Sequence, residues 1–327
     1  MVETIAQIGK AIVDGKRFLV AAHENPDGDA IGSSLALGLA LEEIGKQVTV
    51  YSRGPVPKAI DFLPGRDRIV SDLPDPGEYD TVFILDSGEL NRIGGELEQL
   101  LVGHANIINI DHHRTNDEFG VINLVSEQAS STGELLWKIF RANDIPVGLG
   151  TATNLYTAIY TDTSGFRHSN AGPDSFHICA ELRALGVDNV QVAEEYFFLQ
   201  SEQRVRLLAR ALPTLQIDCD GKIAGISLTL ADAEATGAGW DEVEGFVEFP
   251  RSIFGVQAAY FIREQKGGAV KGSLRSNGMV DVSAVAKEFP RGGGHARASG
   301  FRTEGTLDQV REFLVQRICT QLESNKD

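Results

Sequence analysis

The chain has 327 residues, of which 42% are hydrophobic and 23% are charged, and its formal net charge at pH 7 is −16. Because a single hydrophobic core stops growing near about 250–300 residues, this length predicts two domains. The acidic balance argues against long nucleic acid as a partner, whereas a short phosphorylated ligand needs only a local group of positive charges.

In the first part of the chain, short runs rich in Val, Ile and Leu alternate with helical patterns. We expect strands at residues 18–22, 48–51, 82–85 and 107–110, and helices at 3–14, 30–45, 132–143, 149–160 and 173–185. Apolar strands that alternate with helices are typical of a parallel sheet covered by helices on both faces. The pattern predicts an α/β domain over residues 1–190.

The second part of the chain has a different composition. A charged, periodic segment at 191–212 is expected to be a linker helix. Beyond it we expect strands at 223–230, 256–262 and 269–276, a helix at 282–289, a glycine-rich turn at 292–295 and a last helix at 307–322. This order predicts a smaller α+β domain over residues 213–327.

Neither a membrane span nor a secretory signal is expected. No apolar stretch reaches the about 18–20 residues of a membrane span, and the N-terminus lacks a basic and then apolar leader. Cys179, Cys219 and Cys319 lie far apart without a CxxC pair, which fits a reducing compartment and argues against a cysteine metal site. We therefore expect a cytoplasmic protein that does not bind membranes.

Three of the expected strands end in His and Asp side chains. In open α/β sheets, ligand sites lie beyond the carboxyl ends of the strands, so these side chains should meet at one edge of the sheet. They are His23, Asp27, Asp29, Asp86, Asp111, His112 and His113. Carboxylates gathered in this way repel one another unless cations lie between them.

Helix capping is the simpler interpretation of part of this pattern, since Asp29 or Ser33 would satisfy free N–H groups of the next helix. Capping does not account for His23 and Asp27, or for the residues after the other strands. Two divalent cations would neutralise the four carboxylates of Asp27, Asp29, Asp86 and Asp162. Imidazole with carboxylate suits Mn, Fe, Co or Zn better than Ca, and two neighbouring ions are a known clamp for phosphoryl displacement.

The ordered motifs resemble those of the DHH phosphoesterase superfamily. Residues 23–33 (HENPDGDAIGS) are similar to its first motif, Asp86-Ser87-Gly88 to its second, Asp111-His112-His113 to its signature triplet and Asp162-Thr163 to its fourth. Residues 292–300 (GGGHARASG) resemble the motif of the associated DHHA1 domain. Length and motif spacing are most similar to bacterial bifunctional nano-RNase (oligoribonuclease)/pAp phosphatases, whose core resembles that of the exonuclease RecJ.

The resemblance implies two divalent ions, most typically Mn²⁺. The first would be bound by His23, Asp27 and Asp86, and the second by Asp29, Asp86, His112 and Asp162, with Asp86 as the bridge. Asp111 would orient a ligand, and His113 would face the scissile phosphate as a hydrogen-bond donor or general acid. Residues 163–166 (TSGF) depart from the Asp-Thr-Gly-x-Phe-Arg pattern of the family, which leaves the role of Arg167 open.

The second domain carries candidates for substrate binding. Gly292, Gly293 and Gly294 can bend so that consecutive N–H groups converge on an anion, and Lys271, Arg275 and His295 add positive charge or donors. The alternative is a tight turn whose glycines only let a helix pass a strand. Together with the resemblance, the nearby cations favour phosphate binding.

The resemblance thus implies a Mn-dependent phosphohydrolase with its active site in the cleft between the domains. Its substrates would be RNA of about two to five nucleotides and 3′-phosphoadenosine 5′-phosphate (pAp). Two alternatives stay open: an enzyme of the same architecture that acts on cyclic di-AMP or its linear product pApA, and a non-catalytic nucleotide sensor. A family II inorganic pyrophosphatase shares the metal pattern, but the GGGH segment argues against it. Homodimer formation is left open.

Overall fold

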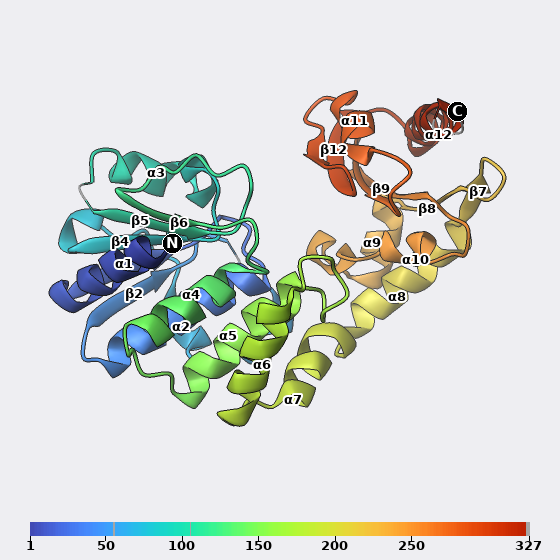
Figure 1. Ribbon diagram of the computed structural model, residues 1–327. Coiled ribbons are helices and arrows are strands. Elements are labelled where there is room, and N and C mark those ends of the chain that lie inside the picture. The colour runs from blue at the N-terminus through green and yellow to red at the C-terminus, as the bar shows by residue number, and fades with distance from the viewer. Residues whose placement is uncertain (55, 105, 325–327) are drawn as a thin grey trace. The chain divides into compact units, whose positions relative to one another are not determined.

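The computed structural model describes residues 1–54, 56–104 and 106–324, and the chain divides into two compact units, Met1–Leu199 and Gln200–Asp327 (Figure 1). Each unit contains one six-stranded sheet. The division falls within the expected linker at 191–212, and residues 325–327 of the expected second domain lie outside the described residues.

The sheet of the first unit is parallel throughout, in the order β3-β2-β1-β4-β5-β6. Its strands are β1 (Arg17–Ala21), β2 (Gln47–Tyr51), β3 (Ile69–Val70), β4 (Thr81–Leu85), β5 (Ile107–Asp111) and β6 (Ile122–Val125). The chain leaves β1 toward β2 on one side and later enters β4 on the other side. The strand order therefore reverses between β1 and β4, where open α/β sheets bind their ligands.

Helices cover both faces of this sheet, as the alternation of strands and helices predicted (Figure 1). The helices are α1 (Val2–Asp14), α2 (Gly28–Glu43), α3 (Gly95–Leu101), α4 (Thr132–Ala142), α5 (Leu149–Asp162), α6 (Pro173–Ala184) and α7 (Asn189–Ala193). Successive strand residues point to opposite faces, so Phe18 and Val20 pack under α1, α2, α4, α5 and α6, whereas Leu19 and Ala21 pack against α3. The α/β prediction is confirmed.

The second unit has a mixed sheet in the order β11-β12-β10-β9-β8-β7, in which only β8 and β9 pair in parallel. Its strands are β7 (Gln216–Asp218), β8 (Ile223–Leu228), β9 (Ala258–Gln265), β10 (Ala269–Ser276), β11 (Gly293–His295) and β12 (Ala298–Glu304). Its helices are α8 (Glu202–Ala211), α9 (Leu230–Thr236), α10 (Glu248–Arg251), α11 (Val282–Lys287) and α12 (Leu307–Ser324).

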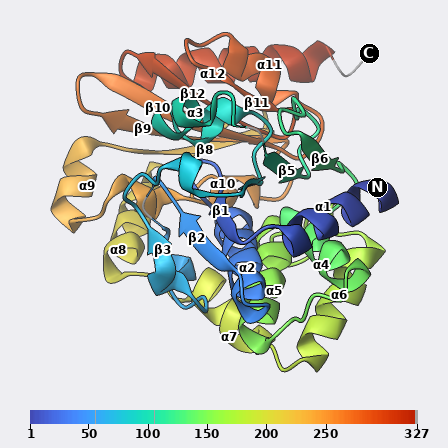
Figure 2. The same ribbon diagram turned by 90° about the vertical axis from the view of Figure 1, so that its left-hand side faces the viewer.

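The two faces of this second sheet are covered differently. Val270 and Leu274 of β10 pack with α11 and α12 on one face (Figure 2). On the other face, Ala259 and Phe261 of β9 pack under α8 and the segment 243–247. The same face of β10 carries Lys271, which is exposed. One face of the sheet is thus left partly open toward β10, β12 and β11.

Two local predictions for the second half of the chain were wrong. The segment 191–212 is not one helix: α7 passes into a π-helical turn at Glu194–Phe198, Leu199 is extended, and α8 starts anew because the Ser201 hydroxyl accepts from the amide of Arg204. Residues 293–295 are not a turn but the edge strand β11, paired with β12. The elements that were not foreseen are strands β3, β6, β7 and β12 and helices α3, α9 and α10.

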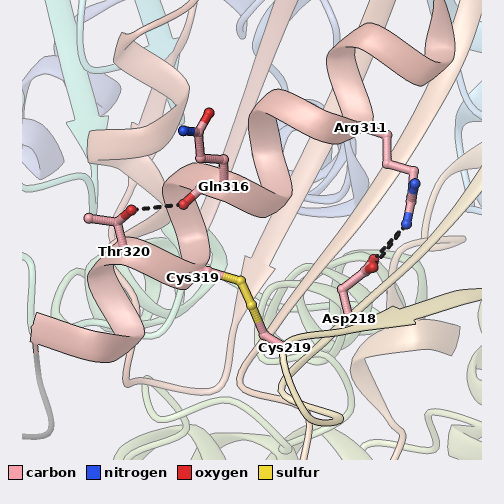
Figure 3. The surroundings of a disulfide bond; sticks show 6 residues. All are labelled: Asp218, Cys219, Arg311, Gln316, Cys319 and Thr320. Atoms are coloured by element: carbon pink, nitrogen blue, oxygen red, sulfur yellow. Dashed lines mark hydrogen bonds and ion pairs between the residues drawn. A yellow bond between two sulfur atoms is a disulfide. The ribbon is translucent and has the colours of Figure 1, made fainter.

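A disulfide joins Cys219, directly after β7, to Cys319 on α12 (Figure 3). The two Cα atoms lie 6.2 Å apart although 100 residues separate them in the sequence. Beside the bond, Arg311 of α12 donates to both carboxylate oxygens of Asp218, at 2.9 and 3.1 Å. The inference of a reducing compartment from cysteine spacing did not foresee this pairing, because the fold and not the sequence distance brings the thiols together.

Cys179 is free and buried in the first unit. Among the described residues, no helix is both long enough and apolar enough to span a membrane.

Candidate metal centre

The expected convergence of His and Asp side chains occurs at the carboxyl edge of the first sheet. Strands β1, β4 and β5 are neighbours in the sheet and run in the same direction, so the residues that follow them lie together. Two sets of side chains have ligand atoms within 4.8 Å of one another: His23, Asp27 and Asp86, and Asp86, His112 and His113. Asp86 belongs to both sets.

The carboxylate of Asp86 faces different partners with its two oxygens. Oδ2 lies 3.6 Å from Nε2 of His23, whereas Oδ1 lies 3.5 Å from Nε2 of His112 and 3.6 Å from Nδ1 of His113. The residue is 2% exposed and has a left-handed φ of 52°, a conformation that costs free energy in a residue other than glycine. This strain and these directions suit a carboxylate that bridges two cations.

Asp27 caps helix α2 and still has a free oxygen. Its Oδ1 accepts from the amides of Asp29 and Ala30, at 3.0 and 3.1 Å. Helix α2 is therefore capped by a side chain, as the capping interpretation expected, but by Asp27 and not by Asp29 or Ser33. A carboxylate oxygen of Asp27 lies within 4.8 Å of ligand atoms of His23 and Asp86, and among the described residues Oδ2 accepts no hydrogen bond.

Asp29 is held by the N-terminus of α4. Its Oδ2 accepts from the amide of Thr132 at 2.7 Å, and its Oδ1 accepts from the amide of Gly133 at 3.1 Å and the hydroxyl of Ser33 at 2.8 Å. These donors stabilise a carboxylate that is only 1% exposed, and they connect α2 with α4. Oδ2 also lies 3.8 Å from Nε2 of His112, so the anchored carboxylate faces the centre.

Asp162 approaches the same histidine from the end of α5. Its Oδ2 lies 3.8 Å from Nε2 of His112 and accepts from Nδ2 of Asn170 at 3.0 Å. Asn170 also donates to the backbone carbonyl of Ser130, at 2.9 Å, and so connects the end of α5 to the start of α4. Arg167 bonds the carbonyl and hydroxyl of Ser164 in its own loop.

Asp111 orients His113 rather than His112. The Asp111 carboxylate is fully buried; Oδ1 lies 2.7 Å from Nδ1 of His113, and Oδ2 accepts from Nδ2 of Asn116 at 2.7 Å. Asn116 also lies 2.8 Å from Oδ1 of Asn109, which places it in a buried polar network at the end of β5. The carboxylate keeps the proton of His113 on Nδ1 and leaves Nε2 for a ligand.

The carboxylates of the centre are buried close to one another, and this shifts their pKa values. Burial, with the nearby charge of Asp86, raises the pKa of Asp27, Asp29 and Asp162, the last to about 7. Burial also disfavours the charge of Asp86 itself, but hydrogen bonds from His112 and His23 outweigh burial and lower its pKa. Without cations, these carboxylates tend to keep their protons, and bound divalent cations would displace those protons.

For the histidines, burial and the neighbouring carboxylates shift the pKa in opposite directions, and the carboxylates dominate. Burial lowers the pKa of His112, but Asp86, Asp29 and Asp162 outweigh it and raise that pKa to about 10. The hydrogen bond to Asp111 raises the pKa of His113. A site that attracts protons so strongly attracts divalent cations for the same reason, and its mixed imidazole and carboxylate donors fit a transition metal.

Four of the candidates of the second unit, Lys271, Arg275, Gly293 and His295, lie on one face of its sheet. His295 is opposite Ala298, which is opposite Arg275, and Gly293 is in the same way aligned with Ser273 through Gly300. Lys271 lies two residues before Ser273 on the same strand and therefore on the same face.

Two features of this face were not visible in the sequence. Glu248 of α10 accepts from Nε of Arg275 at 3.1 Å, so this arginine already has an acidic partner. A Cβ at Gly292 would collide with the backbone of α11, and Gly294 has a φ of 129°, whereas nothing lies within 4 Å of the Cβ position of Gly293. Gly292 and Gly294 are therefore required by the fold, and only Gly293 is free of such a requirement.

The sequence did not reveal the residues that hold the carboxylates of the candidate metal centre in place. Asn116 and Asn170 each follow a motif by a few residues, and Thr132 and Gly133 start a helix whose N-cap is Ser131. The Ser-x-x-Glu pattern at 131–134 signals that helix start, but nothing in it indicates that its free amides bind Asp29.

Comparison with known proteins shows matches along most of the chain. The model of the DHH family, N-terminal domain, matches residues 17–159, and that of the DHHA1 domain matches residues 225–323. The bifunctional oligoribonuclease and PAP phosphatase NrnA of Thermus thermophilus is 33% identical over 97% of this chain and 93% of its own length. The cyclic-di-AMP phosphodiesterase PdeA of Listeria monocytogenes is 26% identical over 94% of this chain, but over 48% of its own length.

Solved structures agree. An exopolyphosphatase-related protein from Bacteroides fragilis has 30% identity and a TM-score of 0.92, with 99% of this chain and 98% of that chain covered. RecJ of Thermus thermophilus in complex with Mn²⁺ has 16% identity and a TM-score of 0.54, with 99% of this chain and 54% of that chain covered. The second similarity shows a shared fold.

Proposed function

We infer the function from the premise that this chain belongs to the DHH family of phosphoesterases and carries a DHHA1 domain. It is a hydrolase of phosphate esters. We propose that it cleaves RNA of about two to five nucleotides to mononucleotides and removes the 3′-phosphate from pAp. The names of the relatives from Thermus thermophilus and Streptococcus mutans, oligoribonuclease and PAP phosphatase, support this assignment.

The position of Asp86 carries the proposal. Its oxygens face His23 on one side and His112 on the other, which suits a bridge between two divalent ions, with Mn²⁺ favoured because it is the ion of the RecJ complex. His23 and Asp27 would complete one ion, and Asp29, His112 and Asp162 the other. Such a pair of ions supplies a hydroxide nucleophile and stabilises the charge that develops on the phosphate oxygens.

His113 is the proposed group for the scissile phosphate. Its Nδ1 is bound to Asp111, so Nε2 is the atom that faces a ligand. That bond raises the pKa of His113 and so favours the protonated ring, which can donate from Nε2 to the phosphate or to the leaving oxygen. Asp111 acts through His113, and Asn116 holds Asp111.

The second unit is the proposed binder of a further phosphoryl group. Arg275, Gly293 and His295 lie at one end of one face of its sheet, and the N–H groups of the edge strand β11 are available to an anion; Lys271 is on the same face at the other end of β10. A phosphate would compete with Glu248 for Arg275.

Cyclic di-AMP or pApA is the second candidate substrate. The similarity to PdeA over 94% of this chain favours it, because the same centre would hydrolyse either phosphodiester. The other alternative, a nucleotide sensor without turnover, is disfavoured because a sensor would not need the complete set of His23, Asp27, Asp29, Asp86, His112 and Asp162.

A substrate panel with purified protein and Mn²⁺ tests the proposal. The panel contains RNA of graded length, pAp, pApA, cyclic di-AMP and pyrophosphate, with chelator-treated protein as the control. We expect the highest kcat/KM on short RNA and pAp, and activity that chelation removes and Mn²⁺ restores. A preference for cyclic di-AMP would favour the second candidate, and nucleotide binding without turnover would leave only the sensor.

A further inference from the structure

Three cations stand in a row across the second sheet. Lys271 at the start of β10 is opposite Arg263 of β9 on one side and opposite Arg302 of β12 on the other. Residues directly opposite in adjacent strands project to the same face, about 5 Å apart. The row therefore lies on the face that also carries Ser273 and Arg275.

Such a row is unfavourable in the free protein. Like charges directly opposite in a sheet repel one another. Burial and the charges of Arg263 and Arg302 together lower the pKa of Lys271, and no carboxylate contributes to it. In a chain with a net charge of −16, partners for cations are abundant, yet within the described part of the chain none of the three forms an ion pair with one.

Arg263 adds a second, independent observation. Its side chain lies over the ring of Trp240, with 4.5 Å between Cζ and the ring centroid, and the residue is only 7% exposed. Its Nη1 is buried without a hydrogen-bond acceptor. Leaving a buried guanidinium N–H group without an acceptor costs free energy, and an acceptor atom of a bound ligand would remove that cost.

The row differs from the phosphate site proposed at Arg275. Four residues of extended strand separate Lys271 from Arg275, about 13 Å between their Cα atoms at about 3.3 Å per residue, so the two cations stand at opposite ends of β10. Arg275 is paired with Glu248, whereas the three cations of the row are not neutralised. The row thus carries the unneutralised positive charge of this face.

We propose that Arg263, Lys271 and Arg302 form a second phosphate site, which binds an additional phosphoryl group of oligonucleotides longer than a dinucleotide. The inference rests on the proposed function, because that function supplies a ligand with several phosphates. Arg263 is fixed by Trp240, and Lys271 and Arg302 are exposed for direct contact. The site lowers KM for longer substrates and leaves pAp, which has no further phosphate, unaffected.

Kinetics of the full-length enzyme on RNA of graded length test the proposal, with Lys271→Gln and Arg302→Gln as variants. Removal of one charge-assisted hydrogen bond at an exposed position should raise KM about tenfold for the pentanucleotide, with no change for pAp. The slope of log KM against log salt concentration should decrease by about 0.7 for each phosphate that the variant no longer neutralises. Lys287→Gln is the matched control, because Lys287 is an exposed cation on α11, which covers the opposite face.

Thermal unfolding at low salt separates binding from a structural role. If the row repels itself, Lys271→Gln and Arg302→Gln unfold at the same or a higher temperature than the wild type. Lower unfolding temperatures with equal KM changes at every length would overturn the proposal, and so would unchanged KM on all substrates. Failure of the proposed function looks different, because the wild type itself would then not hydrolyse short RNA.

Discussion

Replacing Asp111 by asparagine tests whether this buried carboxylate acts through His113. Asp111 accepts two hydrogen bonds, one from His113 and one from Asn116. An amide has only one oxygen, so the side chain of the variant can accept from one of these donors and must present its NH₂ group to the other. If the NH₂ group faces His113, the ring proton moves to Nε2; if it faces Asn116, two donors oppose each other in a buried site.

Both arrangements should lower kcat with little change in KM. A positioned general acid contributes about 10²–10⁴-fold, and an orienting partner of such a group about 10–100-fold. We therefore expect a decrease in kcat of about 100-fold, or about 2.7 kcal/mol in activation free energy at about 1.36 kcal/mol per tenfold. As the proposed general acid, His113 should set the alkaline limb of the rate profile. Asp111 raises the pKa of His113, so that limb should move to lower pH in the variant.

Steady-state kinetics on pAp and short RNA, with metal analysis of each preparation, provide the assay. Asp117→Asn is the control, since it makes the same chemical change at an exposed position six residues later. The reasoning fails if Asp111→Asn retains wild-type kcat, or if the variant binds less metal in proportion to its lower activity. The second result would assign Asp111 to the metal ligands.

Four further changes have defined outcomes. Asp86→Ala should remove turnover and most of the bound metal, since the carboxylate faces both sets of ligands; metal analysis that still finds two ions would refute the bridge. Gly293→Val should fold normally and raise KM for pAp, whereas Gly292→Val should lower the unfolding temperature because its side chain meets the backbone of α11. Cys219→Ser should destabilise the second unit by up to about 4.7 kcal/mol in denaturant titrations, the loop-entropy value for about 100 residues, and reductant should do the same to the wild type only. Metal affinity, measured by titration of the metal-free protein, should weaken as pH decreases below about 7, because Asp162 (pKa about 7) is ionised above that value and protonated below it.

The first unit was predictable because its signals are local. Each buried strand is a continuous apolar run, and the chemically active residues follow it directly, as Asp86 follows β4 and His112 follows β5. Parallel pairing then aligns the ends of neighbouring strands without further information. For this reason, the order of strands and polar residues was enough to predict that these His and Asp side chains gather at one edge of the sheet.

The supporting hydrogen bonds were not predictable in this way. Asn170 reaches Ser130 and Asp162 from a loop, and the amide of Thr132 reaches Asp29 across 103 residues. The residue types that make these bonds are common in turns and helix starts, so the sequence assigns them local roles. The packing of α2 against α4 brings Thr132 to Asp29, and the loop after α5 brings Asn170 to Asp162.

In the second unit the decisive contacts depend on strand register, which is not apparent in the sequence. The sequence shows Lys271 and Arg275 four residues apart, but it does not show that Arg263 and Arg302 stand beside the first or that Glu248 neutralises the second. A shift of one residue in either pairing would turn the partner side chain to the opposite face. The glycine-rich segment therefore becomes a candidate anion site only once β11 is known to pair with β12, because that pairing puts His295 in line with Arg275. The unneutralised cations of the same face lie at the other end of β10.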